Sequence, residues 1–217
     1  MSDSALALKI NEIFYSLQGE TTLAGLPTVF IRLTGCPLRC VYCDTAYAFH
    51  SGERLSLDDI MAKVASFRCR HVTVTGGEPL AQKHCHQLLQ KLCDAAYTVS
   101  LETSGAMDVA DVDARVIKII DIKTPGSGEM GKNRLENLQR LSPQDQLKWV
   151  ICDRHDYEWS KQFIQQYALW DKVELLFSPS HQQLEARQLA DWILEDQLAV
   201  RFQLQLHKQL WGNEPGR

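Results

Sequence analysis

The chain has 217 residues, of which 45% are hydrophobic and 23% charged, and its formal net charge is −4. This length suits one domain with a sizeable core, so a single domain over residues 1–217 is expected. No cluster of Lys and Arg indicates a nucleic-acid footprint, and no apolar run reaches the ~18 residues that a membrane-spanning helix needs. Residues 1–8 lack a basic region followed by an apolar core, which argues against a secretory signal, so we expect a cytoplasmic protein.

Short β-rich runs alternate with longer helical stretches along the chain. The first predicted strand is residues 28–33 (TVFIRL), and it leads into a turn at 35–37. Ser56 then has the character of a helix N-cap, with apolar positions at helical spacing behind it. The remaining predicted elements, in chain order, are strand 71–75, a helix beginning at Pro79, strand 98–101, strand 116–122, strand 146–151, helix 153–169, strand 173–177, helix 182–194 and an extended segment at 200–206.

Alternating strands and helices predict a mostly parallel sheet with right-handed crossovers. Polar and glycine-containing motifs recur just after the strands, and the carboxyl edge of such a sheet is where sites are built. The segment 126–140 is short and begins with glycine, so we expect this one crossover to lack a full helix. The predicted fold class is α/β: an incomplete, open (β/α)6-type partial TIM barrel with irregular crossovers.

Three cysteines stand close together on the loop after the first predicted strand: Cys36, Cys40 and Cys43. Thiolates are soft ligands that suit iron–sulfur clusters and zinc. A structural zinc site needs four ligands, usually in two separated pairs, and the chain has no second pair. Three thiolates on a four-iron cube leave one iron open to a small cofactor.

Other interpretations of the cysteines stay open on the residues alone. The triplet could bind zinc or be incidental. Cys40 and Cys43 also have the spacing of a thioredoxin-like redox pair, although that motif does not explain Cys36. We assign the other four cysteines, which are scattered singly, to structural positions: Cys69, Cys85, Cys93 and Cys152.

The triplet, with Tyr42 before its last cysteine, resembles the defining motif of radical S-adenosylmethionine (radical SAM) enzymes. A second element, residues 76–79 (GGEP), follows the second predicted strand. The resemblance implies a [4Fe–4S] cluster on the triplet, and contacts of the 76–79 backbone and Glu78 with the amino group of S-adenosylmethionine (SAM). Glycines let backbone approach a ligand closely, although such a run also suits a simple turn into a helix.

Five finer motifs run through nearly the whole chain: residues 10–20 (INEIFYSLQGE) before the first predicted strand, Arg32, 44–45 (DT), 102–105 (ETSG) and 204–208 (LQLHK). Together they resemble the family of 7-carboxy-7-deazaguanine synthases of the queuosine pathway. The resemblance implies a lyase that converts 6-carboxy-5,6,7,8-tetrahydropterin to 7-carboxy-7-deazaguanine with loss of ammonia. In that family a 5′-deoxyadenosyl radical removes hydrogen from C6 of the substrate, and Mg2+ aids the ring contraction that follows.

The family resemblance also implies residue roles. Substrate contacts are expected from Leu17, Gln18, Gly19, Arg32, Thr75, Glu102 and His207. SAM contacts are expected from Tyr42, Cys43, Asp44, Gly77, Glu78, Asp121, Ile122, Lys123, Phe177, Ser178, Pro179 and Ser180. Thr45 is expected to ligate Mg2+. The family often has Ser-Pro-Lys where this chain has residues 121–123 (DIK), so only the lysine matches there.

Each polar residue also has a plainer interpretation. Arg32 offers a planar fork for the substrate carboxylate, but an arginine in a strand can also face solvent. Glu102 suits the N–H edge of a pterin, or is a surface charge after a strand. His207 could bond substrate or be structural. Thr45 is an oxygen donor for Mg2+, which keeps several waters, or an N-cap.

The resemblance implies partners as well: a small-molecule pterin, a second copy in a homodimer, and an external electron donor of the flavodoxin kind. Neither a nucleic acid nor a membrane is expected. One rival is a glycyl-radical-activating enzyme, which shares the cysteine triplet but acts on a protein partner; residues 17–20 (LQGE) and 44–45 weigh against it. The other rival is a non-catalytic zinc or iron–sulfur module.

Overall fold

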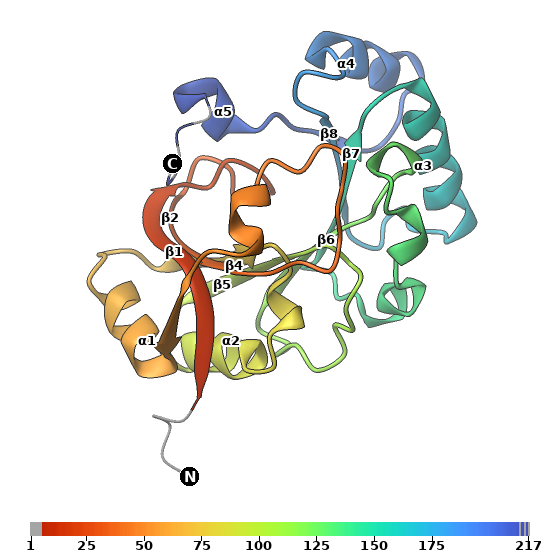
Figure 1. Cartoon of the computed structure of the whole chain (residues 1–217). Coiled ribbons are helices and arrows are strands. Elements are labelled where there is room, and N and C mark those ends of the chain that lie inside the picture. Colours follow the sequence, from red (N-terminus) through yellow and green to blue (C-terminus); the bar gives the residue numbers. More distant parts are fainter. Residues whose placement is uncertain (1–5, 213, 215, 217) are drawn as a thin grey trace.

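A curved nine-stranded sheet forms the centre of the protein (Figure 1). The structure is a computed structural model and describes residues 6–212, 214 and 216; residues 1–5, on which the expectation about a secretory signal partly rests, lie outside the described residues. The strands, in chain order, are β1 (Ala7–Leu17), β2 (Pro27–Leu33), β3 (Glu53–Ser56), β4 (His71–Gly76), β5 (Thr98–Thr103), β6 (Ile117–Asp121), β7 (Gln146–Ile151), β8 (Glu174–Pro179) and β9 (Arg201–Phe202).

The strand order is β3-β1-β2-β4-β5-β6-β7-β8-β9. All neighbours from β2 to β9 pair in parallel, whereas β1 is antiparallel to both β2 and β3. Because parallel strands share one carboxyl edge, the loops that follow them gather at the same end of the sheet. The sheet does not close on itself, and the predicted open, partial barrel is confirmed.

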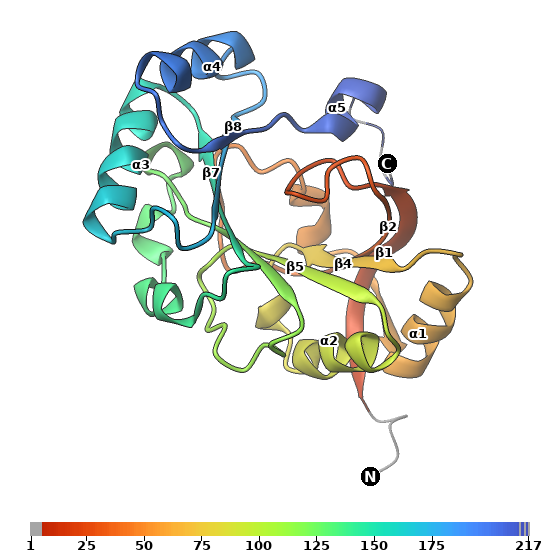
Figure 2. The same ribbon diagram turned by 180° about the vertical axis from the view of Figure 1, so that it is seen from behind.

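Four helices lie along the outer side of this sheet, with α1 beside β1 and β3, α2 beside β5, and α3 and α4 beside β7 and β8, whereas α5 lies at the open end of the barrel (Figure 2). The helices are α1 (Leu57–Ala65), α2 (Cys85–Asp94), α3 (Arg154–Gln166), α4 (Ala186–Glu195) and the short α5 (Leu206–Trp211). Ser56 caps α1 by accepting from the Asp59 amide, as the sequence predicts, and Asp153 caps α3 in the same way.

The buried core lies between the sheet and these outer helices. In α2, Leu88, Leu89 and Leu92 are fully buried, and Cys85 and Cys93 are buried beside them as small hydrophobic residues. In β7 the alternate residues Leu147, Trp149 and Ile151 have no exposed surface, which leaves the intervening side chains to face the inside of the barrel. No described helix has the length and apolar character that crossing a bilayer requires.

Several predicted boundaries are wrong. The residues placed before the first strand are themselves strand β1, which pairs with β2 around an irregularity between Ile10 and Glu12; β3 was also not predicted. Pro79 begins only a 3-10 turn, Pro79–Ala81, and helix α2 begins later, at Cys85.

The carboxyl-terminal elements also differ from the prediction. Ser178 and Pro179 belong to β8, where Pro179 pairs with Ile151, and α4 begins at Ala186 rather than at 182. The extended segment at 200–206 is strand only in β9 and turns into α5 at Leu206. Two crossovers lack an α-helix, not one: the first joins β5 to β6, and the second has only the 3-10 turns Pro125–Ser127, Met130–Lys132 and Leu135–Arg140.

Candidate active site

A cavity of about 860 Å3 lies at the carboxyl end of the parallel strands and extends into the barrel. Strands β2, β4, β5, β6, β7 and β8 all contribute residues to its wall, as do the β1–β2 loop and α5. The residues predicted from sequence that line it are Leu17, Gln18, Gly19, Arg32, Cys36, Cys40, Tyr42, Cys43, Asp44, Thr45, Thr75, Gly77, Glu102, Asp121, Lys123, Ser178, Pro179, Ser180 and His207.

Three predicted cofactor contacts do not line the cavity: Glu78, Ile122 and Phe177, all of them buried. The Glu78 carboxylate is directed away from the cavity, since its oxygens accept hydrogen bonds from the Ser104 amide at 2.7 Å and the Thr103 hydroxyl at 2.9 Å; the expected contact of Glu78 with SAM stays a prediction. Ile122 and Phe177 belong to the hydrophobic core, so their side chains point away from the cavity as well.

The loop with the cysteine triplet, residues 36–43, forms one wall of the cavity and is called the cluster loop below. Its three thiols are free and partly buried. Burial raises the pKa of Cys36, and it raises the pKa of Cys40 to about 11, so a bound metal is needed to favour their thiolates at neutral pH. In the described part of the chain, no three His, Cys, Asp or Glu side chains are arranged to hold a single metal ion.

The 76–79 turn packs directly against the cluster loop. A Cβ on Gly77 would lie 2.3 Å from the Gly35 carbonyl oxygen and 2.8 Å from Cys36 Cβ, so glycine is required for this approach. The Glu78 amide donates to the Gly35 carbonyl oxygen at 2.8 Å. The two motifs singled out in the sequence therefore form one continuous surface.

Polar atoms without partners mark the neighbouring wall, where β6 ends. The buried Asp121 Oδ1 and the Tyr42 hydroxyl have no hydrogen-bond partner. Lys123 lies 3.0 Å from Asp121 Oδ2 and 5.7 Å from the centre of the Tyr42 ring. Burial opposes the charge on Lys123, but the Asp121 carboxylate outweighs it and raises the pKa of this lysine. A cofactor with ammonium, carboxylate and hydroxyl groups fits this set of donors and acceptors, and three thiols beside it suit a cluster.

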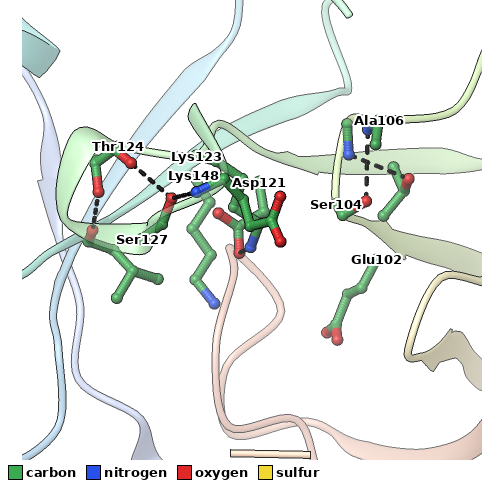
Figure 3. A network of polar contacts seen from close by, with 12 residues as sticks. Glu102, Ser104, Ala106, Asp121, Lys123, Thr124, Ser127 and Lys148 are labelled. Carbon is green, nitrogen blue, oxygen red and sulfur yellow. Dashed lines mark hydrogen bonds and ion pairs between the residues drawn. The ribbon is translucent and has the colours of Figure 1, made fainter. Parts of the chain in front are cut away.

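Charged residues also meet deep inside the barrel, where Lys148 forms an ion pair with Glu20. Figure 3 shows Lys148 beside Asp121 and Lys123, with Glu102 across the cavity. Glu102 accepts from Gln18 Nε2 at 3.2 Å and from the Thr75 hydroxyl at 2.8 Å. Burial and the nearby Glu20 carboxylate raise the pKa of Glu102, which excludes the interpretation as a plain surface charge.

Glu20 and Lys148 are two residues of the site for which no role was predicted from the sequence. The sequence does hold a signal for Lys148: polar and apolar residues alternate over residues 146–149 (QLKW), so Lys148 lies on the face opposite to Leu147 and Trp149. Glu20 belongs to the 17–20 motif. Its pairing with Lys148, across 128 positions, depends on the tertiary structure.

Helix α5 closes one side of the cavity by packing against the β1–β2 loop. The Leu206 amide donates to the Gly19 carbonyl oxygen at 2.9 Å, and a Cβ on Gly19 would lie 2.2 Å from His207 Nδ1. Burial lowers the pKa of His207, so it favours the neutral ring. Gln205, just before the helix, donates to Glu20 Oε1 at 2.8 Å.

Asp44 and Thr45 lie directly after the last cysteine. Burial alone would raise the pKa of Asp44, but the Lys208 ammonium and a hydrogen bond from Thr45 hold it at about 2. The Thr45 hydroxyl donates to Asp44 Oδ1 at 2.9 Å. Thr45 precedes the 3-10 turn Ala46–Phe49 without a side-chain cap hydrogen bond, so the N-cap interpretation is wrong.

Arg32 is held beside the cavity rather than facing solvent, since its side chain is only 16% exposed. Its Nε donates to Glu12 Oε1 at 2.7 Å, and its guanidinium lies 5.7 Å and 5.9 Å from the ring centres of Phe14 and Tyr47. These contacts hold the guanidinium of Arg32 at the wall of the cavity.

Comparison with known proteins agrees with this geometry. Residues 30–167 match the model of the radical SAM superfamily. The chain is 43% identical over 222 residues to 7-carboxy-7-deazaguanine synthase from Koribacter versatilis, covering 95% of this chain and 98% of the relative. It is 47% identical over 208 residues to 7-carboxy-7-deazaguanine synthase from Chlorobaculum tepidum, covering 94% of each chain.

The chain belongs to the 7-carboxy-7-deazaguanine synthase family of radical SAM enzymes. The crystal structure of QueE from Escherichia coli shares the fold, with a TM-score of 0.78 and 23% identity over 93% of this chain and 95% of that one. Membership of this synthase family implies a [4Fe–4S] cluster and SAM. It does not favour the glycyl-radical-activating alternative.

Proposed function

We propose that this member of the synthase family converts 6-carboxy-5,6,7,8-tetrahydropterin to 7-carboxy-7-deazaguanine and releases ammonia. The observation that carries the proposal is the shared cavity: the cysteine triplet, the 76–79 turn, Arg32 and Glu102 all line it or lie against it. The similarity to synthases over 95% of the chain supports the same reaction. Residues 1–217 would act as one radical SAM domain.

Cys36, Cys40 and Cys43 would hold the [4Fe–4S] cluster and leave one iron for SAM. When bound, these cofactors supply one-electron chemistry that removes a hydrogen atom from C6 of the substrate. Asp121 Oδ1 and the Tyr42 hydroxyl, both buried without a partner, suit the polar groups of SAM. Further SAM contacts are proposed from Cys43, Asp44, Gly77, Lys123, Ser178, Pro179 and Ser180.

The substrate would lie between Arg32 and Glu102. The Arg32 fork suits a carboxylate, because it can donate two parallel hydrogen bonds. Glu102, Gln18 and Thr75 form a connected set of acceptors and donors, which suits the N–H and C=O edge of a pterin ring. Further substrate contacts are proposed from Leu17, Gly19 and His207.

Thr45 would contribute one oxygen ligand to Mg2+, with substrate oxygens and waters completing the octahedron. Its hydroxyl lines the cavity and lies next to Asp44, whose lowered pKa keeps a negative charge nearby. Thr45→Ala is expected to raise the Mg2+ concentration that gives half of the maximal rate. A rate that responds to Mg2+ as before would remove Thr45 from the metal site.

We also propose a cytoplasmic homodimer that receives electrons from an external, flavodoxin-like donor. The decisive experiment reconstitutes the cluster without oxygen, supplies reductant, SAM and 6-carboxytetrahydropterin, and follows the deazaguanine product by chromatography and mass spectrometry. Product formation with consumption of SAM supports the proposal. Cleavage of SAM to 5′-deoxyadenosine without product would keep radical SAM chemistry but remove this substrate.

A further inference from the structure

The irregular crossover between β6 and β7 makes hydrogen bonds to the cluster loop from outside the cavity. The Arg39 amide donates to Glu129 Oε1 at 2.6 Å, and the Val41 amide donates to the Ser127 carbonyl oxygen at 3.0 Å. These two backbone donors flank Cys40 on either side. The crossover, about 90 positions away in sequence, therefore holds the loop at the middle cysteine of the triplet.

The turn that contains Ser127 is held by hydrogen bonds to Asp156 of α3, which has no exposed surface. Asp156 Oδ2 accepts from the Thr124 hydroxyl at 2.9 Å and from the Cys152 amide at 3.1 Å, and Oδ1 accepts from the Gly126 amide at 2.8 Å. The Ser127 hydroxyl donates to the Thr124 carbonyl oxygen at 2.6 Å and closes the turn (Figure 3).

Glycine makes the anchoring contact possible. A Cβ on Gly126 would lie 2.5 Å from Asp156 Oδ2, and Gly128 adopts φ +77° where the turn passes the Val41 side chain. Asp156 is not among the described residues that line the cavity. It therefore acts on the site only through the turn that it holds.

We propose that Glu129 and Asp156 are positioning residues that fix the cluster loop around Cys40. Glu129 holds the loop directly, and Asp156 holds the turn from which Glu129 reaches it. The inference rests on the proposed function only in that the triplet binds a cluster. Groups behind metal ligands orient those ligands, and losing them typically costs about 10–100-fold in metal affinity or activity.

The test compares three substitutions of Glu129. Glu129→Gln keeps the length and an oxygen acceptor but removes the charge; Glu129→Asp keeps the charge but is one methylene too short to reach the Arg39 amide. Glu129→Ala removes both. If the hydrogen bond of Glu129 positions the loop, the Glu129→Gln variant should behave as the unchanged protein in both readouts below, and the Glu129→Asp and Glu129→Ala variants should not.

The first readout is cluster retention, followed by the visible absorbance of anaerobically reconstituted protein in excess iron chelator. We expect the cluster of the Ala and Asp variants to be lost about tenfold faster. The low-temperature EPR spectrum of the reduced cluster, with and without SAM, should also change in these two variants only. Glu136→Ala is the matched control, since Glu136 is an exposed acid on the same crossover.

The second readout needs no cluster. Amide hydrogen exchange of the cluster loop in the cluster-free protein should be about tenfold faster in the Ala and Asp variants, because the Arg39 amide loses its acceptor. Asp156→Asn should speed exchange of the loop as well, through the turn.

Equal amide exchange of the cluster loop in all variants would overturn the inference. A Glu129→Gln variant that loses its cluster as fast as Glu129→Ala would also overturn it, since the charge of Glu129 and not its hydrogen bond would then hold the loop. Both results leave the proposed function intact. Conversely, if the unchanged protein keeps its cluster but forms no deazaguanine, the proposed function is contradicted and this inference is not affected.

Discussion

The two halves of the barrel build one cavity in different ways. The half made of β2, β4 and β5 has regular crossovers through α1 and α2. It contributes two loops to the cavity, the cluster loop and the 76–79 turn, as well as Arg32, Thr75 and Glu102 from its strands. The half made of β6, β7 and β8 has 3-10 turns in its first crossover, and it contributes Asp121 and Lys148 from the strands themselves.

This difference concerns the loops more than the strands. Both halves place charged side chains from strands, but the long loop that carries the three cysteines belongs to the first half alone. Asp121 and Lys148 are direct neighbours across β6 and β7, so they present their charges side by side. Burial opposes the charge on Lys148, but its ion pair with Glu20 outweighs that effect and raises the pKa of the lysine.

The largest effect is expected in the first half, from Cys40→Ala. Loss of one thiolate should remove the [4Fe–4S] cluster, and kcat/KM should fall at least about a thousandfold because a catalytic unit is lost. Iron and sulfide content and circular dichroism of the purified variant measure cluster and fold separately. A full cluster in this variant would contradict the assignment of the triplet.

The next effect is expected in the second half, from Lys148→Met. It leaves Glu20 buried without its counter-charge, which should lower the free energy of unfolding by about 3 kcal/mol. Urea denaturation measures this loss. The double variant Glu20→Gln with Lys148→Met should recover most of it, and a double variant no more stable than the single one would show that the pair is not coupled.

The Arg32→Lys substitution, in the first half, should have a smaller effect than Lys148→Met. Lysine can keep the ion pair with Glu12 but cannot offer a fork to the substrate carboxylate, so KM should rise about tenfold with stability nearly unchanged. Steady-state kinetics over a range of pterin concentrations measures this. An unaltered KM would place the substrate carboxylate elsewhere.

The smallest effect is expected from Glu102→Gln, in β5, the strand of the first half that pairs with β6. The folded protein keeps the Glu102 proton to higher pH than the unfolded chain, whose pKa is near 4.5, so the unfolded chain loses its proton first. As pH rises above about 4.5, this group lowers the stability of the unchanged protein but not that of the variant. Unfolding free energies measured against pH should therefore diverge; parallel curves would argue against the raised pKa.

Much of the first half was predictable from sequence because its chemistry sits in short, contiguous motifs. The spacing of the triplet indicated a cluster site, and the family resemblance implied the roles of the 76–79 turn and Thr75. Strand β7 was predicted with correct boundaries. The polar-rich β1 was missed because half-buried strand residues are less apolar, and its pairing with β2 overrides that composition.

Glu78 illustrates why a motif does not give orientation. Its neighbours in the sequence are glycines that pack on the cluster loop, yet its side chain turns inward to Ser104 and Thr103. Local sequence can bring a residue to an edge of the sheet. The direction of its side chain depends on which partner the rest of the fold offers.

Local spacing and strand alternation in the sequence determined an open parallel barrel and a triplet suited to an iron–sulfur cluster, and the family resemblance of its motifs implied most residues of the cavity wall. Only the tertiary structure decided the pairing of Glu20 with Lys148, the packing of His207 on Gly19 and the grip of Glu129 on the cluster loop. These contacts join segments far apart in the chain. No local pattern encodes them, because each forms only after the whole sheet has curved into its barrel.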